Sequence, residues 1–244
     1  MSPSDLMTDV DYALEQLGTD YVDIIVLCRV NPAIPIEDSI KAMNDIVCSG
    51  KAKYMGISEG SAETLRRACT VAPIYCIEQE WSLWTRDIEK DIVPFCQQRG
   101  ILIIAYSPLG RGFLTNTIAS YASLDHTDYR KYGQPRFSAT NFDLNLVMVQ
   151  QAEALAKAKG ITMSQLALAF LHAQGNHVIP IPGTSSMEHL EKNIAARDVV
   201  LSEEELNQLK DIFASEKVVG DRYAHMNMTY HGQISGNNQT KGHT

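Results

Sequence analysis

Short apolar runs alternate with amphipathic segments along most of the chain. Residues 21–28 read YVDIIVLC, a nearly continuous β-branched run that is typical of a strand covered on both faces. Before this run, apolar residues recur at helical spacing from Asp5 to Leu17, and Gly18 supplies a helix-stop signal. The spacing of apolar residues therefore changes from that typical of a helix to that typical of a strand within a few residues.

The same alternation continues downstream. Helices are predicted at 35–50, 61–71, 87–98, 141–159, 163–174 and 186–196 and from Ser202, and further strands at 53–58, 75–79, 101–106 and 178–182. Residues 110–140 form a long polar stretch, and the chain from about Gly220 is rich in Asn, Gly, Thr and His. We therefore expect one structured region over 1–219 and a loose C-terminal tail over 220–244.

Strands that alternate with helices predict an α/β fold with a parallel sheet, either doubly wound or closed as a (β/α)8 barrel. The five predicted strands are too few for the eight that a barrel needs. A Rossmann fold would need a Gly-rich turn after its first strand, but this strand continues into Cys-Arg-Val-Asn-Pro. The pattern alone leaves both arrangements open.

Composition narrows the class of protein. The 244 residues are 45% hydrophobic and 20% charged, as expected for one globular domain or two small ones. A net charge of -8 argues against a nucleic-acid or anionic membrane surface, because both require clustered Lys and Arg. Five cysteines without metal-ligand spacing, and the lack of a signal sequence or long apolar run, predict a cytoplasmic chain with no metal site and no membrane contact.

The candidate functional residues are those at the strand ends, since the carboxyl ends of parallel strands face the ligand in such folds. Glycines and hydroxyls follow the last two strands, in SPLGRG at 107–112 and PGTSS at 182–186. Backbone N–H groups there could hold phosphates, and an ordinary turn and helix cap explains them equally well. Glu78 and Glu80, two apart on a strand, face the same side as an acid/base pair or a polar cluster.

In this order, DYVDIIVL, GKAKYMGISEG, AYSPLGRGFL and IPIPGTSSMEHLEKNIAA closely resemble segments of the aldo-keto reductases, in particular their plant-like and microbial branch. The resemblance covers roughly residues 4–212. The family is a TIM barrel that reduces aldehydes and ketones by hydride transfer from NADPH. The resemblance implies that this chain is a partial (β/α)8 barrel, carrying strands four to eight with their helices, in an N-terminally truncated protein.

The resemblance also implies a cofactor site. It puts Ser58 and Glu59 near the nicotinamide carboxamide, Glu78 in place of the family's Gln on that group, and the ring of Tyr106 against the nicotinamide. The residues implied at the pyrophosphate are Ser107, Leu109, Gly110 and Arg111. Those implied at the adenosine and 2′-phosphate end are Gly183, Thr184, Ser185, Ser186, His189 and Asn193.

Several departures from the family pattern bear on activity. The family's catalytic Asp, Tyr and Lys come from segments before strand four, which precede Met1, and Cys28 stands where the family has a carbonyl-orienting His. A thiol is a weak hydrogen-bond donor, so we expect no intact catalytic group. Ser185 and Ser186 replace a usual basic residue and leave His189 as the nearby candidate, so NADP(H) and NAD(H) both stay open.

Two classes of function follow. In the first, the chain is an incomplete NAD(P)H-dependent reductase of a small carbonyl substrate, whose gene model starts too late or whose missing strands come from a partner or second copy. In the second, favoured by Cys28 and Glu78, it is a non-catalytic cofactor-binding or regulatory relative, or a decayed paralogue. Five parallel strands cannot close at barrel geometry, so we expect open sheet edges that favour self-association.

Overall fold

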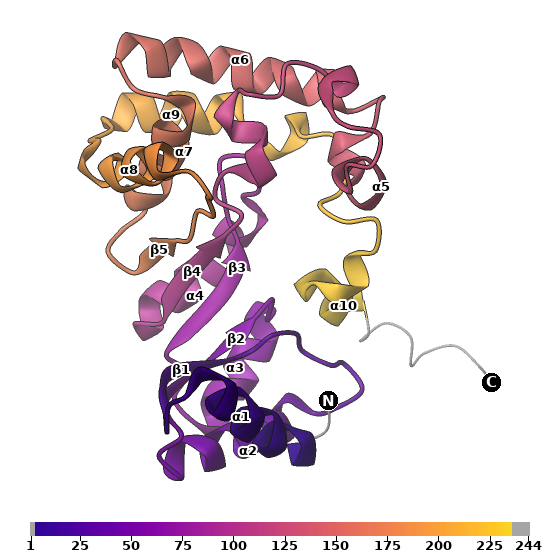
Figure 1. Cartoon of the computed structure of the whole chain (residues 1–244), viewed down its shortest axis with the longest axis vertical. Coiled ribbons are helices and arrows are strands. Elements are labelled where there is room, and N and C mark those ends of the chain that lie inside the picture. The colour runs from indigo at the N-terminus through magenta and orange to yellow at the C-terminus, as the bar shows by residue number, and fades with distance from the viewer. Residues whose placement is uncertain (1–2, 236–244) are drawn as a thin grey trace, which may run out of the picture. The chain divides into compact units, whose positions relative to one another are not determined.

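The computed structural model describes residues 3–235 and has an α/β fold (Figure 1). Its described residues form one five-stranded sheet in the order β1-β2-β3-β4-β5. The strands are β1 Val22–Leu27, β2 Ala52–Ser58, β3 Cys76–Glu80, β4 Leu102–Tyr106 and β5 Val178–Pro180. β2 pairs in parallel with β1 and with β3, so the predicted parallel α/β class is confirmed.

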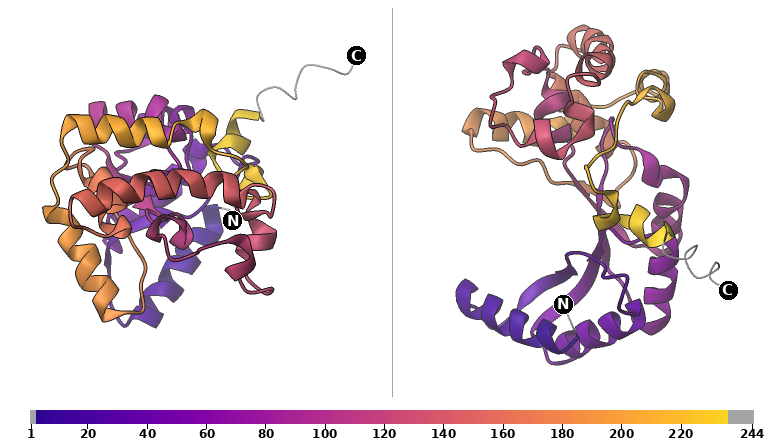
Figure 2. Two further views of the ribbon diagram at one scale, coloured as in Figure 1. Left: turned by 90° about the horizontal axis from the view of Figure 1, so that it is seen from above. Right: turned by 90° about the vertical axis from the view of Figure 1, so that its right-hand side faces the viewer.

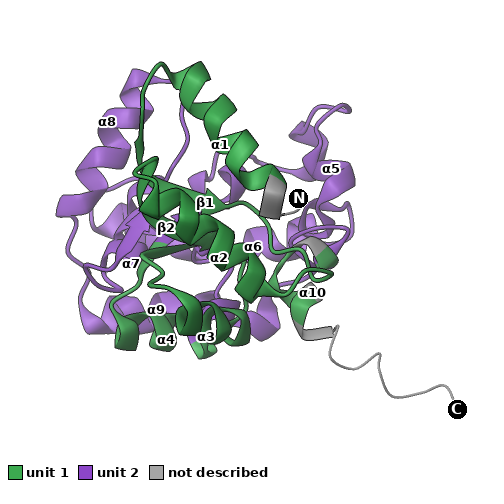
Figure 3. Cartoon of the chain, turned by 90° about the horizontal axis from the view of Figure 1, so that it is seen from below, with its two compact units in different colours: residues 1–79, 90–103, 227–244 green, residues 80–89, 104–226 purple. Residues whose placement is uncertain are grey.

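The chain divides into two compact units (Figure 3). Unit 1 comprises residues 1–79, 90–103 and 227–244, and unit 2 comprises residues 80–89 and 104–226. Each unit has its own buried core and is described by itself below.

Unit 1 packs helices against the first strands of the sheet. Figures 1 and 2 show α1 and α2 along one face of β1 and β2. Its fully buried apolar side chains include Ile40, Met43, Ile57, Leu65 and Ile77. Burying each stabilises the fold by roughly 1.5–3 kcal/mol. The helices are α1 Pro3–Leu17, α2 Ile36–Cys48, α3 Ala62–Val71, α4 Ile92–Arg99 and α10 Tyr230–Ser235.

One predicted helix is divided in two. The sequence predicts a single helix over 87–98, but the structure has the 3-10 helix η1 Asp87–Lys90 followed by α4. Asp91 lies between them with φ -139°, and its carboxylate accepts a hydrogen bond of 2.7 Å from the Ile92 N–H. Pro94 has no N–H, so it is tolerated in the first turn of a helix but not in its interior. The helix therefore restarts at Ile92.

Unit 2 is largely helical. The cluster of Trp84, Phe113, Phe137 and Phe142 lies in its core, with the rings of Trp84 and Phe113 stacked at 4.0 Å. The helices are α5 Arg130–Gly133, α6 Phe142–Ala158, α7 Met163–His172, α8 Met187–Ala195 and α9 Glu203–Ile212. Short 3-10 helices are η2 Gly110–Thr115, η3 Tyr121–Ser123, η4 Pro135–Phe137, η5 Ala196–Asp198 and η6 Ser215–Lys217, and η7 Met226–Met228 follows at the unit boundary.

The segment predicted as a loose tail, 220–244, includes residues with buried side chains. Arg222 is 2% exposed in unit 2, Tyr230 is 5% exposed in unit 1, and α10 lies within the segment. Residues 236–244 of the predicted tail lie outside the described residues. The domain boundary near 219 stays a prediction.

Gly56 in β2 lies close to Cys76 of the neighbouring strand β3 in unit 1. A Cβ at this position would lie 2.5 Å from the Cys76 Sγ and 2.8 Å from the Cys76 carbonyl oxygen. We predict that Gly56→Ala lowers the free energy of unfolding by about 1–3 kcal/mol, because the two strands would have to separate. Urea unfolding measures this change.

Gly133→Ala is the matched control, because no atom lies within 4 Å of its added Cβ and its φ is not positive. It should change the free energy of unfolding by no more than about 0.5 kcal/mol. Equal stability of the two variants would contradict the assignment of Gly56 to strand contact.

Candidate functional site

A pocket of about 650 Å³ lies within unit 2, beside the loop after β4 and the N-terminal half of α8. Its lining is rich in hydroxyls and includes three basic residues, Arg111, His189 and Lys192. None of the described residues that line it is an Asp or Glu. The lining comprises Ser107, Pro108, Leu109, Arg111, Gly112, Thr115, Thr117, Thr162, Ser164, Ile181, Pro182, Gly183, Thr184, His189, Lys192 and Asn193.

The loop after β4 has an unusual backbone. Ser107 and Arg111 have φ values of 50° and 55°, and Gly110 and Gly112 have 56° and 88°. A side chain other than glycine in this left-handed region costs on the order of 1–3 kcal/mol. Such strain persists where the surroundings impose it, as they do here beside the pocket. The strain supports a functional interpretation of SPLGRG over an ordinary turn.

The second loop, PGTSS, forms a turn and a helix cap. The Thr184 Oγ1 accepts from the Ser186 N–H at 3.1 Å, and the Ser186 Oγ accepts from the His189 N–H at 3.4 Å as the N-cap of α8. The turn-and-cap interpretation is therefore confirmed for Ser186. Gly183 and Thr184 in addition line the pocket.

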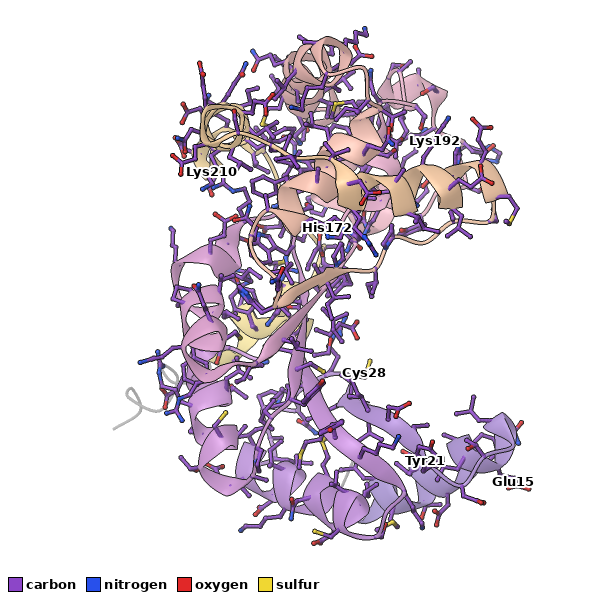
Figure 4. The ribbon with its side chains drawn as sticks, turned by 90° about the vertical axis from the view of Figure 1, so that its left-hand side faces the viewer. Glu15, Tyr21, Cys28, His172, Lys192 and Lys210 are labelled. Carbon is purple, nitrogen blue, oxygen red and sulfur yellow. The ribbon has the colours of Figure 1, made fainter. Side chains whose placement is uncertain are left out.

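The structure adds a cation that the sequence analysis missed. His189 was the basic candidate near PGTSS, but Lys192 also lines the pocket from α8 (Figure 4). Its Nζ lies 2.6 Å from the Glu188 Oε1 in a partly exposed ion pair. The i, i+3, i+4 spacing of His189, Lys192 and Asn193 puts them on one helical face, which is the signal that could have identified Lys192.

The pocket brings together seven of the residues implied as cofactor ligands. They are Ser107, Leu109, Arg111, Gly183, Thr184, His189 and Asn193. Tyr106, Gly110, Ser185 and Ser186 belong to the same unit but are not in the lining. Ser58, Glu59 and Glu78 belong to unit 1.

Arg111 has a second set of partners in unit 2. Its Nη1 and Nη2 each donate at 2.9 Å to Glu80, whose carboxylate is 2% exposed. Arg222 Nη1 donates to the same carboxylate at 3.2 Å. Burial lowers the pKa of Arg111, but the hydrogen bonds and charge of Glu80 outweigh this and raise it above its ordinary value. Glu80 thus belongs to an ion-pair cluster, which favours the polar-cluster interpretation over an acid/base pair.

Tyr106 is joined to the same cluster. Its hydroxyl lies 3.3 Å from that of Tyr223, and Arg111 Nη2 donates to the Tyr223 hydroxyl at 2.8 Å. The guanidinium carbon of Arg111 also lies 4.9 Å from the centre of the Tyr223 ring, a cation–π contact. No local sequence pattern indicates a role for Tyr223, because its partners are more than 100 residues away in the chain.

In unit 1, Cys28 follows directly after β1 and is exposed (Figure 4). The adjacent Arg29 donates from Nη1 to the Cys28 carbonyl oxygen at 2.6 Å and to the Ser58 Oγ at 3.0 Å. Arg29 thus links the ends of β1 and β2, and the Ser58 hydroxyl already accepts one hydrogen bond.

Glu59 is fully buried in unit 1 with a φ of 54°. Its Oε2 accepts from the Tyr230 N–H at 3.2 Å, and its carbonyl oxygen accepts from the Gln233 Nε2 at 2.6 Å. Glu78 is half-buried. The C-terminal segment therefore packs against one of the residues implied at the carboxamide.

Within residues 3–235, no group of three or more His, Cys, Asp or Glu side chains is arranged to hold a metal ion. No helix among these residues is both long enough and apolar enough to cross a membrane.

Comparison with known proteins identifies relatives over most of the chain. The model of the aldo/keto reductase family matches residues 1–214. The probable aldo-keto reductase 1 of Glycine max is 40% identical over 227 residues, which are 91% of this chain and 64% of the relative. The chain thus spans less than two thirds of the length of this curated relative.

Two solved structures are also similar to most of this chain. A thermostable aldo-keto reductase, crystallised with the inhibitor epalrestat, matches with a TM-score of 0.70 and 31% identity over 87% of this chain and 67% of its own. The glycerol dehydrogenase of Gluconobacter oxydans matches with a TM-score of 0.81 and 26% identity over 87% of this chain and 64% of its own.

We predict that Glu80→Gln destabilises the protein strongly, because it leaves Arg111 and Arg222 without their buried carboxylate. Removing one partner of a buried ion pair costs about 3–5 kcal/mol. The free energy of unfolding in urea measures this loss.

Glu63→Gln is the control, because its ion pair with Arg66 is solvent-exposed. Exposed pairs contribute about 0–1 kcal/mol, so this variant should unfold close to the wild-type midpoint. If Glu80→Gln behaves like Glu63→Gln, Glu80 does not anchor unit 2.

Proposed function

The chain belongs to the aldo/keto reductase family, and on this basis we propose that it binds NAD(P)H through the pocket of unit 2. The observation that carries the proposal is the convergence in one pocket of seven residues implied as cofactor ligands by the family resemblance. The loop after β4 supplies three of them, and the PGTSS loop together with α8, some 70 residues later in the chain, supplies the other four.

The chemistry of the lining fits the phosphates of a dinucleotide. Hydroxyls can donate to phosphate oxygens, cations offset their charge, and no carboxylate among the lining residues repels them. We propose that Ser107 and Thr184 donate to the cofactor, and that Lys192 and His189 lie at its 2′-phosphate end. These two side chains favour NADPH over NADH, since a 2′-phosphate needs a positive partner.

For the nicotinamide end we propose the roles that the family implies. Ser58, Glu59 and Glu78 lie near the carboxamide, and the Tyr106 ring stacks on the nicotinamide. The bound cofactor would supply the hydride. An ionised Glu78 can accept from the carboxamide N–H₂ but cannot donate to its oxygen, so it serves this group less fully than a Gln.

We further propose that the five strands correspond to strands four to eight of the family barrel, within a structured region that ends near residue 219. The match to relatives over only part of their length supports this correspondence. In a closed barrel, further strands would pair with the two edges of this sheet. Edges without such strands favour self-association, because an unpaired edge offers free N–H and C=O groups.

The reaction proposed for the family member as a whole is NAD(P)H-dependent reduction of small aldehydes and ketones. For the 244 residues themselves we propose cofactor binding without turnover. Cys28 supports this, because a thiol is a weak hydrogen-bond donor and therefore a poor group to orient a carbonyl.

Fluorescence titration with NADPH tests the proposed pocket. We predict saturable binding to the wild-type chain and a loss of about tenfold in NADPH affinity for Lys192→Ala, which corresponds to about 1.4 kcal/mol. NADH affinity should stay the same, because NADH has no 2′-phosphate.

Lys157→Ala is the control, because Lys157 is 71% exposed on α6 and is not in the pocket lining. It should leave both affinities unchanged. Equal losses for NADPH and NADH in Lys192→Ala would contradict the 2′-phosphate assignment, and no binding at millimolar NADPH would overturn the cofactor site.

A panel of aldehydes with NADPH tests the proposed lack of turnover. We predict no consumption of NADPH beyond the rate without protein, both for the wild-type chain and for Cys28→His. The family resemblance gives a histidine at this position the role of orienting the carbonyl and gives proton donation to a tyrosine, so Cys28→His alone does not supply the proton donor. Reduction of any aldehyde by either protein, followed as loss of NADPH absorbance, would refute this assignment.

A further inference from the structure

A chain of hydrogen bonds in unit 2 runs from Arg111 through Tyr223 to Tyr106. The Arg111 Nη2 lies 2.8 Å from the Tyr223 hydroxyl, which lies 3.3 Å from the hydroxyl of Tyr106. A guanidinium can only donate, whereas a phenol can both donate and accept. The Tyr223 oxygen therefore accepts from Arg111, and either of the two tyrosine hydroxyls can be the donor in the contact between Tyr223 and Tyr106.

Arg111, the first residue in this series of hydrogen bonds, is held in a fixed orientation. Arg111 makes a bidentate pair with Glu80, and its carbonyl oxygen accepts from the Arg130 Nη1 at 2.7 Å. Bidentate arginine–carboxylate pairs fix the orientation of the guanidinium as well as its position. Arg111 thus presents its remaining donor in a fixed direction.

Tyr223 is held on two further sides. The guanidinium of Arg111 lies over its ring at 4.9 Å, and the preceding residue, Arg222, is tied to the same Glu80 carboxylate at 3.2 Å. The Tyr223 hydroxyl therefore has little freedom to move from its place between Arg111 and Tyr106. A fixed hydroxyl sets the direction of the long axis of a tyrosine ring, because the oxygen lies on that axis.

We propose that Tyr223 is a positioning residue that holds the ring of Tyr106 in the orientation in which it receives the nicotinamide. The proposal rests on the cofactor role of Tyr106 proposed above. Tyr106 lies at the end of β4, and its side chain is half-buried, so part of it is accessible to solvent. A ring that is already oriented loses less conformational entropy when a ligand stacks on it, so Tyr223 raises cofactor affinity without touching the cofactor.

Tyr223→Phe removes the hydroxyl and keeps the ring under Arg111. With 3-fluorotyrosine incorporated at position 106, we expect the fluorine resonance to shift and broaden in this variant, because the Tyr106 ring loses its fixed partner. The affinity for NADPH should fall about three- to tenfold, the range for one lost hydrogen bond. The resonance is measured without cofactor, so it reports on the ring alone.

Tyr129→Phe is the matched control, because Tyr129 is 62% exposed in the same unit and is not one of the three residues, Arg111, Tyr223 and Tyr106, that these hydrogen bonds join. It should change neither the fluorine resonance nor the affinity. Urea unfolding of both variants separates a local change at Tyr106 from a loss of the fold, and we expect Tyr223→Phe to remain folded.

The two measurements separate the two proposals. An unchanged resonance in Tyr223→Phe overturns the positioning role, and so does an unchanged NADPH affinity when the wild type binds. If neither protein binds NADPH, the proposed cofactor function fails, and the resonance alone decides whether Tyr223 orients Tyr106.

Discussion

The buried carboxylate of Glu80 is the constraint on which unit 2 depends. It is 2% exposed and accepts from both Arg111 and Arg222. A carboxylate removed from water is stable only when its oxygens are paired, so three segments distant in sequence must meet at this point. They are the end of β3, the loop after β4 and the segment that follows η6.

This ion pair explains the shape of the loop after β4. Ser107 and Arg111 keep left-handed backbone angles that cost free energy, and the Arg111–Glu80 pair helps to hold this loop in place. Arg111 lines the pocket and also donates to Glu80 through its guanidinium. His189 and Lys192 on α8 are the other basic residues among the described lining residues of this pocket.

Residues of the C-terminal segment form hydrogen bonds with buried residues in both units. In unit 2, Arg222 shares the Glu80 carboxylate, and in unit 1 Gln233 donates to the Glu59 carbonyl oxygen and accepts from the Ser61 N–H at 3.0 Å. Buried polar groups need partners, and a segment without strong helix or strand periodicity can still supply them. Polar composition alone thus does not decide whether a segment is loose.

The sequence by itself determined the α/β class, the strands and most helix bounds, because apolar periodicity follows directly from which side chains a helix or strand buries. It also indicated both loops of the pocket, since glycines and hydroxyls after strands are local signals. Only the tertiary structure decided the partners of Arg111, the place of Lys192 in the lining and the contact of Tyr223 with Tyr106. These depend on residues far apart in the chain, whose meeting no local pattern encodes.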